Sequence, residues 1–248
     1  MRARRTRKDE ATMKIWGYWA TLGWSVLAYL AGQIAATAIV LLWQQGDLSS
    51  LVRTPYDGAT ITLSVLALNP VTVAVLFAAV RLAKADPVEY LALAWPRARD
   101  VATGVIGLIC LIAVSDGLLY LSGEGLVTSF QLQSYTTAVA EGWLPAMLFA
   151  AIIVAPAGEE ILFRGFLFRG FVRPERPAWP GIVATAVLFA IPHVQYDWVG
   201  VSQILVVGLF LAWMRLRSGS IVLTFLLHAL FNLEGTLETV AQVHFFAK

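Results

Sequence analysis

Long apolar runs separated by short polar stretches dominate this chain. Seven such runs, each poor in charge, occupy residues 15–43, 59–82, 101–121, 144–172, 180–197, 199–216 and 220–240. Runs of this length suit helices that cross a hydrocarbon core of about 30 Å, and they lack the alternation of a membrane-spanning β-strand. Because only helices and closed barrels satisfy every backbone group in lipid, the pattern predicts an all-α fold, a polytopic transmembrane bundle of about seven spanning helices.

Composition agrees with this pattern. Of the 248 residues, 58% are hydrophobic and only 14% are charged, a balance too apolar for a soluble domain. We expect a basic cytoplasmic arm over residues 1–14 and a single membrane domain over residues 15–248. The lone cysteine, Cys110, excludes an internal disulfide framework.

The basic residues predict the orientation. With the N-terminus inside, sixteen of the eighteen Lys and Arg residues fall in cytoplasmic segments, and only Arg53 and Lys248 fall outside. We therefore expect an integral protein of a prokaryotic inner membrane, with a cytoplasmic N-terminus and an external C-terminus. The basic arm is explained by topology and by contact with the lipid bilayer, so nothing indicates a nucleic-acid partner.

Four polar side chains fall at similar depth in three of the predicted helices. At about 1.5 Å per residue, Glu159 and His193 lie ~20 Å from the inner ends of their helices, and His228 and Asn232 lie roughly 12 and 18 Å deep. One buried histidine is most often a packing or hydrogen-bonding residue. Ionisable side chains are energetically costly at this depth in a membrane, so two histidines and a carboxylate there favour a functional site.

The spacing of residues within the fourth run predicts that its two carboxylates lie on different faces of the helix. Glu160 and Arg164 are four residues apart and share a helical face, so Arg164 can neutralise Glu160. Glu159 points about 100° away from that face. It is then the carboxylate without a built-in partner, available to act as a general base.

The other two helices repeat a four-residue spacing. Phe189 and His193 share one face in the predicted fifth span, as His228 and Asn232 do in the seventh. A carboxylate and a histidine that deprotonate water, opposite a histidine and an amide that donate to an oxyanion, form a plausible site for peptide hydrolysis.

Three ordered motifs carry a resemblance to a known family. They are Glu159-Glu160-x-x-x-Arg164, Phe189-x-x-x-His193 and His228-x-x-x-Asn232. Together they resemble the signature of the CAAX prenyl protease type II and bacteriocin-processing family (CPBP, or Abi) of intramembrane proteases, over residues 144–240. The resemblance implies that Glu159 and His193 activate water, that His228 and Asn232 stabilise the oxyanion, and that Glu160, Arg164 and Phe189 are supporting residues.

The same side chains could also bind a metal ion. Glu159, His193 and His228 together form a set that zinc accepts, with an open position for water. However, the chain has no His-Glu-x-x-His motif, and water activated by Glu and His needs no ion. We therefore favour a metal-free mechanism over a zinc cofactor.

The sequence thus predicts an intramembrane endopeptidase acting on a membrane-embedded or membrane-anchored protein or peptide, which enters laterally or from the cytoplasmic side. One alternative is a transporter in which Glu159, His193 and Asp116 relay protons or ions, although no repeat supports it. Another is a non-catalytic immunity or scaffold protein with the same fold.

Overall fold

The computed structural model describes residues 15–49 and 56–246, and the predicted basic arm lies outside this part. The described residues are helical, without strands. The helices longer than ten residues are α2 (Tyr18–Trp43), α4 (Gly58–Leu82), α6 (Ala98–Ser122), α7 (Ser129–Glu141), α11 (Trp179–Ala190), α12 (Trp198–Ser218) and α13 (Ile221–Ala241). The shorter ones are α5 (Pro87–Tyr90), α8 (Leu144–Phe149), η1 (Ala150–Val154), α9 (Ala155–Glu160), η2 (Ile161–Leu167), α10 (Phe168–Phe171) and η3 (Gln242–Phe246).

The all-α prediction is confirmed. Segments α8 to α10 form one continuous helix over Leu144–Phe171, and it is one of six helices in the described part that are long and apolar enough to cross a membrane. With the shorter apolar helix α11, the predicted number of about seven spans holds. The protein is therefore an integral membrane protein.

Side-chain caps explain where several helices begin. Asp57 accepts a hydrogen bond from the Thr60 amide at the start of α4, and Asp197 accepts one from the Gly200 amide at the start of α12. Ser220 accepts from the Leu223 amide at the start of α13. Each cap satisfies a backbone donor that the first helical turn leaves open.

Two predicted segments differ from the structure. Residues 123–142, which fall between the predicted spans 101–121 and 144–172, contain α7, which begins with a capping box between Thr128 and Gln131 and ends at Gly142 with φ 78°. The predicted fifth span, 180–197, is helical only as far as Ala190, and Pro192 follows two residues later. Because proline has no backbone N–H to continue the i to i−4 hydrogen bonds, α11 stops well short of the predicted end.

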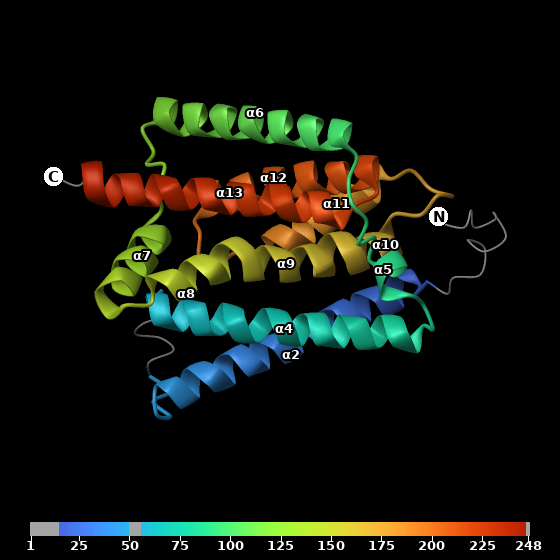
Figure 1. Ribbon diagram of the computed structural model, residues 1–248, viewed down its shortest axis with the longest axis horizontal. Helices are drawn as coiled ribbons and strands as arrows, with labels where there is room; N and C mark the ends of the chain where they lie inside the picture. Colours follow the sequence, from blue (N-terminus) through green and yellow to red (C-terminus); the bar gives the residue numbers. More distant parts are fainter. Residues whose placement is uncertain (1–14, 50–55, 247–248) are drawn as a thin grey trace.

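The helices assemble into a bundle with two distinct ends (Figure 1). Helix α2 packs along α4, where Gly32 allows close approach because a Cβ there would lie 2.7 Å from the Leu68 carbonyl oxygen. Helix α6 lies along one side, against α12 and α13. Helix α7 lies at the end near the C-terminus, and α5 lies at the opposite end.

Candidate active site

The helix that carries the two adjacent carboxylates has two wide, π-helical turns. Segment η1 precedes α9, and η2 follows it directly after Glu160. Wide turns of this kind are frequent at functional sites. Here each contains a carbonyl that accepts a side-chain hydrogen bond from another helix: Ala151 from Asn232, and Arg164 from Arg215.

Glu160 and Arg164 form the predicted internal ion pair. Arg164 Nη1 donates to Glu160 Oε1 at 2.8 Å, and both side chains are 1% exposed. Arg164 also donates to the Gly208 carbonyl at 3.1 Å, and its guanidinium lies 4.2 Å from the centre of the Phe189 ring. The buried charge of Arg164 is therefore balanced by one carboxylate, one carbonyl and one aromatic face.

His228 stands between the two carboxylates. Its Nδ1 lies 3.0 Å from Glu160 Oε1, and its Nε2 lies 3.8 Å from Glu159 Oε2. Because an ionised carboxylate only accepts, the shorter contact assigns the Nδ1 proton to His228 and fixes the direction of the ring. Glu160 thus orients a histidine as well as pairing with Arg164, a second contact that the sequence did not predict.

His193 lies beyond the end of α11, in the connection to α12. The prediction that Phe189 and His193 share a helical face is wrong, because the helix ends between them. They nevertheless touch: His193 Nδ1 lies 2.9 Å from the Phe189 carbonyl oxygen, and the two rings are 5.1 Å apart. A carbonyl only accepts, so Nδ1 carries the proton and Nε2 of the neutral ring is available as a base.

The Phe189 ring is the common neighbour of the charged and polar groups. Its centroid lies 5.6 Å from that of His228 at 85°, in addition to its contacts with His193 and Arg164. The ring is 2% exposed. Its position separates the two histidines with an apolar, rigid spacer and supports the predicted structural role of Phe189.

Asn232 is held by the first wide turn. Its Nδ2 donates to the Ala151 carbonyl at 2.8 Å, which fixes which end of the amide is the donor. One of the two N–H bonds is used there, and an amide nitrogen has a second to offer. The side chain lies one helical turn from His228 on α13.

One cavity brings these residues together. It has a volume of about 280 Å³, is partly open, and is lined by Glu159, His193, His228 and Asn232 together with Phe189. Glu159 retains 25% exposure of its side chain, whereas the Glu160 side chain is 1% exposed. The predicted division between an accessible and an internal carboxylate is therefore present in the structure.

The candidate zinc set is not gathered for metal binding. Among the described residues, the one group of three whose ligand atoms all lie within 4.8 Å of one another is Asp116, Glu234 and Glu238. Glu159, His193 and His228 do not converge in this way, and His228 Nδ1 is already engaged by Glu160. These residues do not fit a preformed zinc site.

Sequence reasoning missed part of the cavity wall. Tyr196 lines the cavity, and its ring stacks with that of His193 at 6.4 Å and 29°. Phe130, from α7, packs edge-on against Tyr196 at 5.3 Å and also lines the cavity. The capping box that starts α7 was the available sequence signal for this part.

Comparisons with known proteins agree with the position of the motifs. Residues 141–233 match the family model described as type II CAAX prenyl endopeptidase Rce1-like. An uncharacterized 24.3 kDa protein of Escherichia coli is 37% identical over 83 residues, which cover 33% of this chain and 38% of that protein. No solved structure matches. The family match includes every residue of the candidate site.

Proposed function

We propose that this protein is an intramembrane endopeptidase, because residues 141–233 match the family model described as type II CAAX prenyl endopeptidase Rce1-like. Its substrate is a membrane-embedded or membrane-anchored protein or peptide, and water is the nucleophile. The observation that carries the proposal is the convergence of Glu159, His193, His228 and Asn232 on one cavity inside the helical bundle.

In this proposal each side chain has its own task. His193 Nε2 takes a proton from the attacking water, and Glu159 holds that water against the substrate. The water oxygen adds to the scissile carbonyl carbon, and the carbonyl oxygen becomes an oxyanion. In its imidazolium form, His228 donates Nε2–H to this oxyanion, and Asn232 donates its second N–H.

Collapse of the tetrahedral intermediate completes the reaction. The C–N bond breaks, and the leaving nitrogen receives the proton that His193 took from water. Glu160 stays ionised throughout and keeps His228 in place through the 3.0 Å contact to Nδ1. Arg164 and Phe189 hold Glu160 and the two imidazoles in position and do not touch the substrate.

Glu159→Gln tests the proposal directly. The change keeps the size of the side chain and removes its charge, so the protein should fold and insert while hydrolysis falls by about 10²- to 10⁴-fold. Mass-spectrometric comparison of membrane-protein termini, with and without the variant, measures the loss. The matched control is Glu175→Gln, an exposed carboxylate in the connection before α11.

The result separates the three classes of function. A folded Glu159→Gln protein that still generates the same new termini would eliminate the assigned mechanism. A transporter or a non-catalytic scaffold predicts identical termini for the wild type and for both variants, with no termini that depend on this protein.

A further inference from the structure

The cavity occupies only one half of the bundle. On each of four helices, the lining residues belong to the half nearer α7 and the C-terminus: Ile61 and Val65 on α4, Met147 to Glu159 on the fourth span, Gly200 to Val207 on α12, and His228 to Thr239 on α13. The wall at that end is α7 with its preceding loop, which supplies Leu126, Thr128, Phe130, Gln131, Ser134 and Tyr135.

The other half of the bundle is filled by side chains. Directly beyond the carboxylates, Phe166 is 0% exposed, and its ring packs at 5.6 Å against that of Tyr90 on α5, which is also 0% exposed. The neighbouring residues of α4, Leu76, Ala79 and Val80, belong to the same core. In the part of the chain that the structure describes, this packed core separates the α5 end from the candidate site.

Hydrogen bonds connect the segment after α5 to the start of α13 at this end of the bundle. The Ile221 amide donates to the Ala92 carbonyl at 3.1 Å, and the Ser220 hydroxyl donates to the Ala94 carbonyl, so the segment after α5 is fixed to the start of α13. These groups lie at the α5 end of the bundle, opposite α7 (Figure 1).

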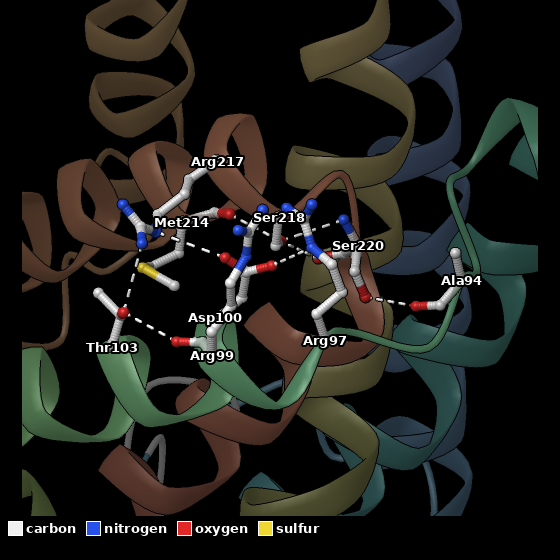
Figure 2. A network of polar contacts seen from close by, with 9 residues as sticks. All are labelled: Ala94, Arg97, Arg99, Asp100, Thr103, Met214, Arg217, Ser218 and Ser220. Carbon is white, nitrogen blue, oxygen red and sulfur yellow. Dashed lines mark hydrogen bonds and ion pairs between the residues drawn. The ribbon is translucent and has the colours of Figure 1, made fainter.

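Ion pairs between α6 and α12 lie at the same end (Figure 2). Asp100, 1% exposed at the start of α6, accepts a hydrogen bond from Arg97 Nε at 2.7 Å and lies 3.5 Å from Arg217 Nε at the end of α12. Arg217 also donates to Thr103. These ion pairs join the start of α6 to the last turn of α12, so charge pairs as well as packing connect the helices at the end opposite the cavity.

Charge distinguishes the two halves. Along the length of the bundle, all ten Lys and Arg residues in the described part lie either at the level of Arg164 or nearer the α5 end. The α7 end holds eight Asp and Glu residues and, among the described residues, no Lys or Arg. Basic residues are retained on the cytoplasmic side of membrane proteins. The packed half therefore faces the cytoplasm, and the cavity faces the opposite side.

We propose that the candidate site is reached from the extracytoplasmic face, past α7, and that its substrates present their scissile bond on that face. The substrate class is then an exported or membrane-anchored polypeptide cut in its extracytoplasmic juxtamembrane segment. This identification of the substrate rests on the proposed endopeptidase function, whereas the side of access rests on geometry and charge alone. Of the two entry routes predicted from the sequence, lateral and cytoplasmic, it replaces the cytoplasmic one.

Cysteine labelling tests the side of access without any substrate. In a Cys110→Ser background, Leu126→Cys places a thiol at the cavity wall before α7, and Trp95→Cys places one in the exposed segment after α5. A membrane-impermeant maleimide added to intact spheroplasts should label the Leu126→Cys protein, and label the Trp95→Cys protein only after permeabilisation. Any other pattern overturns the proposal.

The positions of the cleavage sites test the substrate class. Termini that depend on Glu159 should map to extracytoplasmic segments of membrane-anchored or exported proteins. If they map to cytoplasmic segments, the substrate class is wrong although the endopeptidase function stands. If no termini depend on Glu159, both the endopeptidase function and the substrate class are wrong. The labelling result still decides which side of the membrane the cavity faces.

Discussion

Replacement of Arg164 by methionine probes the buried pair on which the candidate site depends. Methionine keeps an unbranched apolar side chain and removes the guanidinium. The variant loses the 2.8 Å contact to Glu160, the 3.1 Å hydrogen bond to the Gly208 carbonyl and the contact with the Phe189 ring. Since Glu160 is left ionised and buried, the expected loss in the free energy of unfolding is about 3–5 kcal/mol.

Reversible unfolding in bicelles, driven by added denaturing detergent, measures this loss. The double variant Glu160→Gln/Arg164→Met should recover part of the stability, because the neutral amide no longer needs a cation. A double-mutant cycle then gives the coupling between the two residues. The contact between His228 and Glu160 remains in the single variant, so the cycle reports on the ion pair.

Arg217→Met is the matched control. Arg217 is 41% exposed and lies 3.5 Å from Asp100, which keeps its closer partner Arg97. A pair whose cation is this well solvated, and whose carboxylate keeps a closer partner, is expected to contribute about 0–1 kcal/mol. The reasoning is refuted if Arg164→Met costs less than about 1 kcal/mol, or if the two arginine variants lose equal stability.

Two further substitutions address the cavity itself. Asn232→Ala should lower kcat by about 10²- to 10³-fold on an identified substrate peptide with little change in KM, because the amide acts on the oxyanion; a change in KM alone would contradict that role. Gly58→Ala should displace α7, because a Cβ there would lie 2.5 Å from Ala138 Cβ and 2.7 Å from the Ala138 backbone nitrogen; maleimide labelling at Val65→Cys should then rise. Gly23→Ala is the control, since nothing lies within 4 Å of its Cβ position, and equal labelling in both variants would show that α7 is not the cover.

Local features of the sequence predicted much of this protein correctly. Apolar run length identified the spanning helices because lipid leaves the backbone few other solutions. The spacing of Glu160 and Arg164 predicted their ion pair, because residues four apart on a helix are neighbours whatever surrounds them. The same periodicity predicted that Glu159 and Glu160 point to different environments, and their side-chain exposures of 25% and 1% agree.

These local rules do not predict the contacts between helices. No spacing along the chain indicates that His228 lies between both carboxylates, or that Asn232 binds a carbonyl in a wide turn of another helix. The early end of α11 places His193 in a connection that only the packing of neighbouring helices fixes.

Because length, periodicity and charge act locally, the sequence alone predicts that the chain spans a membrane, which residues are candidates for the chemistry and how the basic residues are distributed. The tertiary structure decided which half of the bundle is hollow. The position of the cavity depends on how side chains from several helices fill a shared volume. Phe166 and Tyr90 pack together in one half of the bundle, while α7 forms a wall of the cavity in the other half.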